Sequence, residues 1–322
     1  MNKSATNKAA ENPSKDQPVI KVRDLSKSFG QKKAVSQVNL TVNQGDIFGF
    51  LGPNGSGKTT TIRLLCGLLT PDSGSGECLG YDILKQSYAI KCNVGYMTQR
   101  FSFYEDLSIR ENLDFIARMY GMKNRRRTVD DAIERLGLTQ RQNQMAGALS
   151  GGWKQRLALS ACMIHQPRLL LLDEPTAGVD PQARRDFWDE IHTLAANGVT
   201  VLVSTHYMDE AERCSRLAYI SYGRLLAEGT PKKLISDADL STWTVEGPDI
   251  FSLAQSIRAV PAAQQVVAFG SSLHVSGRDG DALAQGLEKW RADPAYTVRQ
   301  VESSLEDVFI HLMHSSSDQR YE

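Results

Sequence analysis

One stretch of the sequence, Gly-Pro-Asn-Gly-Ser-Gly-Lys-Thr-Thr at residues 52–60, combines residue types that together can hold phosphate groups. Gly52, Gly57, Lys58 and Thr59 match the spacing of a Gly-x-x-x-x-Gly-Lys-Thr loop. The glycines let backbone N–H groups approach a phosphate, the lysine adds a positive charge, and the threonine hydroxyl suits Mg²⁺. A glycine-rich turn with an incidental lysine is the alternative. We expect a nucleoside triphosphate to be bound by Gly52, Pro53, Asn54, Gly55, Ser56, Gly57, Lys58, Thr59 and Thr60.

A pair of acids, Asp173 and Glu174, directly follows a run of leucines. A short all-apolar run predicts a strand buried on both faces of a parallel sheet, and the carboxyl ends of such strands gather ligands. Asp173 can hold Mg²⁺ through its water shell, and Glu174 is placed to polarise an attacking water. A strand end that meets solvent is the alternative. Downstream of a phosphate-binding loop, the pair predicts a metal ligand and a catalytic carboxylate.

A second potential anion site occurs in Leu-Ser-Gly-Gly-Trp-Lys-Gln-Arg, residues 149–156, which we call the signature segment. Ser150, Gly151 and Gly152 open an expected helix, where a hydroxyl, two glycine N–H groups and the helix dipole can bind phosphate. One chain with one phosphate-binding loop does not need two such helix ends. We therefore expect two copies to close head-to-tail over two ATP molecules, each signature segment serving the other copy's nucleotide.

These motifs, in this order, closely resemble the ATP-binding subunit of ABC transporters over residues 19–236. The resemblance implies that Phe29 stacks on adenine, the alternative being a core aromatic. It implies that Gln99 senses Mg²⁺ and the γ-phosphate and that Asp180 crosses the dimer interface. It also implies that His206 contacts the γ-phosphate, for which a purely structural histidine is the alternative. The implied catalytic residues are Glu174, His206 and Lys58, the implied metal ligands are Thr59, Gln99 and Asp173, and the implied cofactors are ATP and Mg²⁺.

Two positions depart from the usual pattern of that family. Trp153 is bulky where the family usually has a slimmer or polar residue. Ala-Gly-Val-Asp at residues 177–180 stands where many members have Ser-Ala-Leu-Asp. Neither change removes a phosphate ligand, so we expect an active ATPase in which Trp153 tunes the signature contacts or the gap between the two copies.

The elements that must position these residues can be read from apolar patterns. Residues 19–25 and 38–42 predict an antiparallel β lobe, the second by strict alternation. Nearly continuous apolar runs predict buried parallel strands at residues 46–52, 168–174 and 199–206. A mostly helical stretch occupies residues 108–166. Alternating strands and helices imply an α/β fold: a P-loop NTPase core with an antiparallel lobe and a helical subdomain.

The composition changes near residue 240, and a small C-terminal α+β domain is expected beyond it. The expected order is strand 241–245, helix 250–260, strand 266–269, strand 272–275, helix 281–291, strand 296–301 and helix 305–314. The first six elements have the order of a ferredoxin-like domain. Ser303 and Glu306 fit a capping box for the last helix. The expected regions are a disordered tail at 1–18, an ABC ATP-binding domain at 19–236 and an accessory or regulatory domain at 240–316.

Composition limits the classes of function. The 322 residues include 37 Lys+Arg and 37 Asp+Glu, so the formal net charge is zero, and a dedicated nucleic-acid binder would show a basic excess. No apolar run approaches the roughly 18 residues of a membrane span, and the first 18 residues lack the apolar segment of a signal peptide. The five scattered cysteines predict reduced, mostly buried thiols in the cytosol.

Two functions from different classes fit the motifs: the energy-coupling ATPase of a membrane exporter, and a soluble ABC ATPase that acts on nucleic acid or ribosomes. A single ATPase domain, no heptad run before the signature segment and a neutral charge favour the exporter.

The C-terminal ending Val-Glu-Ser-Ser-Leu-Glu-Asp-Val-Phe resembles the ATPases of ABC-2-type exporters, including multidrug exporters. An amphipathic helix that packs on its own domain is the alternative interpretation. The resemblance implies ABC-2-type permease subunits as partners, a homodimer or heterodimer of ATPase domains, no nucleic acid, and a peripheral location at the cytoplasmic face of the membrane. Phe101, Phe103 and Tyr104, expected to be exposed near Gln99, are the best candidate wall of a permease-docking groove, although a core role for some of them is the alternative.

Overall fold

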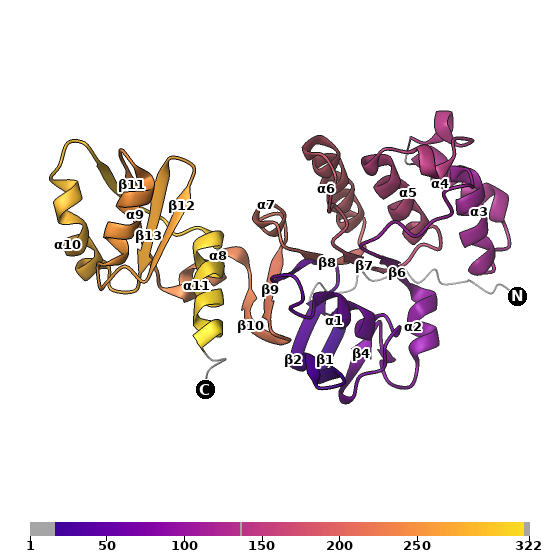
Figure 1. The fold of residues 1–322 in the computed structure, drawn as a ribbon. Coiled ribbons are helices and arrows are strands. Elements are labelled where there is room, and N and C mark those ends of the chain that lie inside the picture. Colours follow the sequence, from indigo (N-terminus) through magenta and orange to yellow (C-terminus); the bar gives the residue numbers. More distant parts are fainter. Residues whose placement is uncertain (1–16, 136, 319–322) are drawn as a thin grey trace, which may run out of the picture. The chain divides into compact units, whose positions relative to one another are not determined.

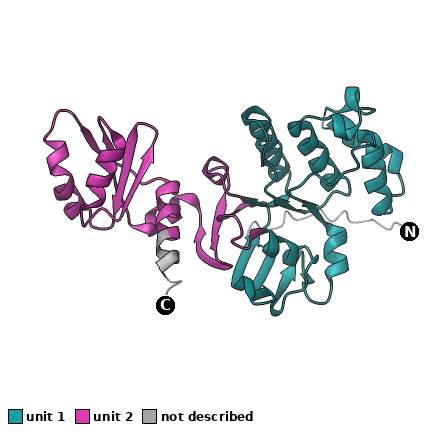
Figure 2. Ribbon diagram, viewed as in Figure 1, with its two compact units in different colours: residues 1–47, 59–204 teal, residues 48–58, 205–322 magenta. Residues whose placement is uncertain are grey.

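The computed structural model describes residues 17–135 and 137–318, and side chains up to residue 313. The expected tail, residues 1–18, lies outside the described residues except for its last two. The chain divides into two compact units (Figure 2). Unit 1 comprises residues 1–47 and 59–204, and unit 2 comprises residues 48–58 and 205–322.

An antiparallel four-stranded sheet forms one part of unit 1 (Figure 1). In the order β2-β1-β4-β5, it contains β1 (Pro18–Phe29), β2 (Lys32–Asn43), β4 (Ser73–Cys78) and β5 (Tyr81–Asp82). Val22 of β1 pairs with Leu40 on one side and with Gly76 on the other. A Cβ at Gly76 would lie 2.3 Å from the Lys21 carbonyl oxygen, so only glycine fits this close approach. The predicted antiparallel lobe is confirmed.

Three parallel strands form the second sheet region of unit 1, with β7 (Leu169–Asp173) between β6 (Val94–Met97) and β8 (Thr200–Thr205). Every residue of β7 and β8 is buried, which accounts for their nearly continuous apolar sequences. Asp173 pairs with Ser204 where both strands end. The accompanying helices are α1 (Lys58–Leu65), α2 (Ser87–Asn93) and α6 (Pro181–Ala196).

The predicted helical subdomain is present in unit 1 as α3 (Ile109–Met119), α4 (Arg125–Arg135) and α5 (Gly151–Met163), with short 3-10 turns at Thr139–Arg141 and Ala146–Ala148. A capping box begins α3, because Ser108 accepts from the Glu111 N–H while the Glu111 carboxylate accepts from the Ser108 N–H. Residues from all three helices, among them Leu113, Val129 and Leu157, pack into one buried cluster.

Unit 2 contains the strand that leads into the phosphate-binding loop. β3 (Ile47–Leu51) pairs in parallel with β9 (Arg216–Ser221), which pairs antiparallel with β10 (Arg224–Gly229). The nearby helices are α7 (Met208–Ala211), α8 (Pro231–Ala238) and α11 (Leu305–Asp318). Phe309 of α11 stacks on Tyr219 of β9 with ring centroids 4.8 Å apart, and both side chains are buried.

The C-terminal elements of unit 2 are β11 (Ser241–Glu246), α9 (Ile250–Arg258), β12 (Gln265–Phe269), β13 (Ser272–Gly277), α10 (Gly280–Arg291) and β14 (Thr297–Val301). Their antiparallel sheet has the order β12-β13-β11-β14. Buried residues such as Trp243, Leu253 and Leu283 pack α9 and α10 on the sheet. The predicted order and ferredoxin-like topology are confirmed. The boundary at 236–240 stays a prediction, since the units divide after Ser204.

The capping box predicted for the last helix is wrong by one residue. Ser304, not Ser303, accepts from the N–H of the third helical residue, Asp307, and the Asp307 carboxylate accepts from the Ser304 N–H. The Ser303 hydroxyl instead donates to the Leu240 carbonyl and bonds to the Thr242 hydroxyl. The helix starts where it buries Leu305 and Phe309, and this packing selects between two adjacent caps of the same chemistry.

Candidate functional site

The phosphate-binding loop of unit 2 follows β3 and leads into α1, the context that the motif requires. Gly52, Gly55 and Gly57 have φ angles of 153°, 77° and 110°, which side-chain-bearing residues rarely adopt. A Cβ at Gly52 would lie 2.1 Å from the Ile220 carbonyl oxygen of β9. Glycine is therefore required by the close approach of β9 as well as by the loop conformation.

Two polar side chains of this loop are buried. The Lys58 ammonium donates to the carbonyl oxygens of Gly52 and Pro53 at 2.7 and 3.1 Å, so the lysine lies across the loop. The Ser56 hydroxyl is buried without a hydrogen-bond partner among the described residues. Buried hydroxyls are normally paired, so Ser56 fits a loop whose remaining acceptors come from a bound phosphate.

Unit 1 brings Thr59 and Asp173 together at the carboxyl end of β7. The Thr59 hydroxyl donates to Asp173 Oδ1 at 3.0 Å, and the Ser204 hydroxyl donates to the same oxygen at 2.8 Å. Burial raises the pKa of the Asp173 carboxyl, and these two hydrogen bonds oppose the shift. A carboxylate beside a threonine hydroxyl is an oxygen donor set that suits Mg²⁺. The residues present therefore fit the predicted metal.

Glu174 lies next to Gln99, whose side-chain N–H donates to Glu174 Oε2 at 2.9 Å. The Glu174 backbone has φ 47°, in the left-handed region that non-glycine residues seldom occupy. Such a conformation costs on the order of 1–3 kcal/mol and is found mostly at functional sites. The predicted metal ligands Thr59 and Asp173 thus form one hydrogen-bonded pair. The predicted metal ligand Gln99 and the predicted catalytic Glu174 form a second.

The signature segment begins α5, as predicted, with Ser150 at the N-cap position. The Ser150 side chain is exposed and makes no capping hydrogen bond to its own helix. A Cβ at Gly152 would lie 2.6 Å from the Ala183 Cβ, so α5 and the start of α6 are in close contact. Asp180 caps α6 by accepting from the N–H groups of Gln182 and Ala183.

Trp153 packs within its own subdomain. Its ring lies against the buried cluster of α3, α4 and α5. The guanidinium groups of Arg141 and Arg156 lie 4.7 and 5.3 Å from the ring centroid, distances typical of cation–π contacts. The bulk of this residue is therefore accommodated inside unit 1, and its influence on a dimer gap stays a prediction.

Phe29 ends a strand, whereas His206 lies one residue beyond the strand that was expected to include it. Phe29 is the last residue of β1 and its side chain is 52% exposed, so the core alternative is wrong. In unit 2, His206 is exposed directly after β8, with its ring 4.1 Å from that of Tyr207. The Thr205 hydroxyl donates to Glu210 and accepts from the Tyr207 N–H, which fixes the turn around His206.

The aromatic residues after Gln99 divide between core and surface. Phe101 and Phe103 are half-buried, lie 5.3 Å apart by ring centroids, and pack against the cluster of the helical subdomain. The expectation that both are exposed is wrong and the alternative core role fits both, because they pack against that buried cluster. Tyr104 is exposed and meets Phe115 of α3 edge-on at 5.2 Å.

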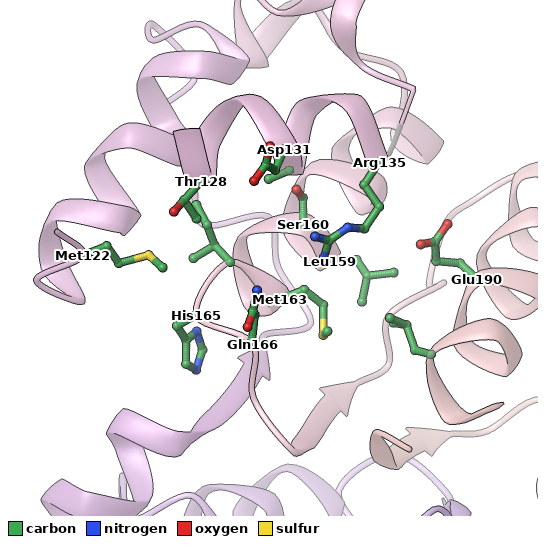
Figure 3. Close-up of a pocket in the computed structure, with 13 residues that line it drawn as sticks. Met122, Thr128, Asp131, Arg135, Leu159, Ser160, Met163, His165, Gln166 and Glu190 are labelled. Carbon is green, nitrogen blue, oxygen red and sulfur yellow. The ribbon is translucent and has the colours of Figure 1, made fainter. Parts of the chain in front are cut away.

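A separate cavity of about 190 Å³ lies between α4, the end of α5 and α6 in unit 1. Figure 3 shows Asp131 and Arg135 of α4 and Ser160 of α5 around it. The buried Ser160 hydroxyl has no hydrogen-bond partner among the described residues. None of the nucleotide ligands predicted from the sequence is among the described residues that line this cavity.

Comparison with known proteins gives consistent matches. Residues 35–177 match the family model described as ABC transporter. The Nod factor export ATP-binding protein I of Ralstonia nicotianae is 35% identical over 302 residues, which cover 92% of this chain and 94% of that protein. The probable multidrug ABC transporter ATP-binding protein YbhF of Escherichia coli is 44% identical over 218 residues, 67% of this chain. The match spans only 38% of YbhF.

Solved structures agree with these matches. A nucleotide-free ATP-binding cassette from an ABC transporter superposes with a TM-score of 0.62 at 27% identity. The superposition covers 69% of this chain and 94% of that structure. Within the described ranges, every helix is too short or too polar to serve as a membrane span.

Proposed function

The chain belongs to the ATP-binding proteins of ABC transporters, and on that premise we propose that it is the energy-coupling ATPase of a membrane exporter. The observation that carries the site assignment is the pair of contacts at the end of β7, Thr59 to Asp173 and Gln99 to Glu174. Export is supported by relatives named for Nod factor export and multidrug transport.

We assign binding of the nucleotide phosphates to the phosphate-binding loop. The loop N–H groups, Lys58 and the Ser56 hydroxyl would hold the phosphates. Thr59, Asp173 and Gln99 would hold Mg²⁺, which when bound neutralises charge on the phosphate oxygens. The exposed Phe29 ring would stack on the adenine.

For the chemical step, the Glu174 carboxylate would orient the attacking water and accept its proton. The hydrogen bond from Gln99 to Oε2 restricts the orientation of the Glu174 carboxylate. His206, exposed directly after β8, would donate to the γ-phosphate. Lys58 would stabilise the negative charge that develops on the phosphate oxygens.

The working form would be a head-to-tail dimer. The uncapped Ser150 hydroxyl, with the N–H groups of Gly151 and Gly152, would bind the γ-phosphate held by a second copy. Asp180 at the start of α6 would lie at the same interface. Hydrolysis removes the shared phosphate contact, so ATP and its products favour different states of the dimer.

An exposed apolar patch on unit 1 would receive the partner. Tyr104, Phe115 and Met119 are exposed on or beside α3, and apolar patches of this kind mark protein contacts. We propose that short cytoplasmic helices of ABC-2-type permease subunits dock there and place this chain at the cytoplasmic face of the membrane. Residues 240–316 would form an accessory or regulatory domain.

The test is a Glu174→Gln variant, which keeps the side-chain shape and the ligands of Mg²⁺. Loss of a general base typically lowers a rate by about 10²–10⁴-fold, so ATP should bind but persist. Size-exclusion chromatography should show a dimer with ATP and a monomer with ADP. Turnover at the wild-type rate would overturn the assignment of Glu174.

Two further variants separate binding from dimerisation. In a Glu174→Gln background, Ser150→Arg should abolish the dimer while each monomer still binds ATP, whereas Ser256→Arg, on the exposed side of α9, should leave the dimer intact. Lys58→Ala should remove ATP binding itself. A Ser150→Arg protein that still dimerises with ATP would place the interface elsewhere.

A further inference from the structure

We propose that the Ser204 hydroxyl is a positioning group for ATP hydrolysis, which fixes the orientation of the Asp173 carboxylate and of the Glu174 backbone. The inference rests on the proposed function of Glu174, but it concerns a residue that no sequence motif identifies. Ser204 lies at the end of β8, beside Asp173 in the parallel register, and its side chain is fully buried.

The Ser204 hydroxyl forms hydrogen bonds to both acidic residues. It donates to Asp173 Oδ1 at 2.8 Å and accepts from the Glu174 backbone N–H at 3.0 Å. The same N–H lies 3.1 Å from the Ser204 carbonyl oxygen. A hydroxyl offers one hydrogen and two lone pairs, so donation to one acid and acceptance from the next residue are compatible.

The backbone of Glu174 explains why this contact matters. Its left-handed conformation, φ 47°, persists only where surrounding contacts hold it. The N–H bonds to Ser204 anchor that turn, and the turn aims the Glu174 side chain toward Gln99. Ser204 is fully buried, so if its hydroxyl were removed, water could not readily take its place as hydrogen-bond partner of Asp173 and the Glu174 N–H.

The bond to Asp173 has a second effect. Both Thr59 and Ser204 donate to Oδ1, which fixes the rotation of the carboxylate and directs Oδ2 away from these two bonds. Partners that orient a metal ligand typically contribute 10–100-fold to affinity or activity. Ser204 would thus orient both the metal ligand Asp173 and the base Glu174 through one side chain.

The experiment compares Ser204→Ala, Ser204→Thr and Ser276→Ala by steady-state ATPase assays with ATP and Mg²⁺ varied. Ser204→Ala should lower kcat about 10–100-fold and raise the Mg²⁺ needed for half activity, with the KM for ATP within about twofold. Ser204→Thr retains the hydroxyl and should recover most of kcat. Ser276 is equally buried and bonded to Thr242, so Ser276→Ala controls for a general loss of stability.

A double variant links the effect to Glu174. At saturating Mg²⁺, where the effect through Asp173 is compensated, adding Ser204→Ala to Glu174→Gln should lower the residual kcat by less than about twofold, since both changes then remove the function of Glu174. Should Ser204→Ala fail to fold, Ser204→Cys, a weaker hydrogen-bonding group, should show the same fall in kcat. A wild-type kcat in Ser204→Ala, or an equal fall of kcat in Ser276→Ala, would overturn the proposal about Ser204. The proposed function would still stand in that case if Glu174→Gln were inactive. An active Glu174→Gln would overturn the proposed function itself.

Discussion

At the scale of single residues, His165 shows how burial ties a side chain to pH. Its Nε2 lies 3.1 Å from the Val94 carbonyl oxygen, and its ring stacks on Tyr120 with centroids 3.9 Å apart. Burial lowers the pKa of His165 below its usual range near 6.5, so the folded protein holds the ring neutral. As the pH falls, His165 is therefore protonated at a higher pH in the unfolded chain than in the folded protein.

A pH dependence of stability follows from that order of protonation. The unfolded state binds more protons below about pH 6.5, so this residue contributes stability above that pH, and the contribution is lost as pH falls through it. Replacement by neutral glutamine, His165→Gln, should reduce the loss of Tm between pH 7.5 and 5.5, measured by thermal unfolding. Tyr120→Phe keeps the ring contact and should retain the wild-type loss. Equal losses in wild type and His165→Gln would contradict this account.

At the scale of elements, the start of α11 gives a discriminating test. Ser304 caps the helix, so Ser304→Ala should lower the free energy of unfolding by about 0.5–2 kcal/mol in urea denaturation. Glu306 belongs to the box that the sequence predicts but not to the one that forms. Glu306→Gln should therefore change stability by less than about 0.5 kcal/mol. A larger loss for Glu306→Gln than for Ser304→Ala would support the predicted cap instead.

Elements that bury a continuous apolar run were predictable, and contacts between distant segments were not. β7 and β8 can be recognised in the sequence because both faces of each strand are buried, so each strand is a short and mostly apolar run. β10 has a mixed sequence with half-buried residues, and no local signal identifies it. The role of Ser204 depends on strand register over a separation of 31 residues, which a single sequence does not display. Phe101 was misplaced because its cover comes from helices further along the chain.

At the scale of the whole molecule, α11 supports the strand that flanks the phosphate-binding loop. Phe309 is buried against Tyr219 of β9, and β9 pairs with β3. Phe309→Ala should cost about 3–5 kcal/mol of stability, seen as a lowered Tm. Phe251 is 84% exposed on α9, so Phe251→Ala should leave Tm unchanged. If both variants melted alike, α11 would not support β9.

The same contact bears on truncation. Every predicted nucleotide ligand precedes residue 240, so a protein ending there would keep them all. It would also lose Phe309 and expose the Tyr219 ring. The truncated protein should still bind ATP, but its Tm should be lower than that of the full chain. A separately added peptide of residues 305–313 should restore part of the lost Tm, because it would cover that ring again.

The surroundings of Trp153 give the protein an optical reporter. Of the four tryptophans, all within the described residues, Trp188, Trp243 and Trp290 are buried, while Trp153 is half-buried near the start of α5. Trp153 is three residues after Ser150, and its ring centroid lies 4.7 and 5.3 Å from the guanidinium groups of Arg141 and Arg156. Emission that an added quencher can reach therefore arises mainly from this one ring. Closure of a second copy over the signature segment would shield the indole, so the fluorescence of the natural sequence follows assembly without an attached dye.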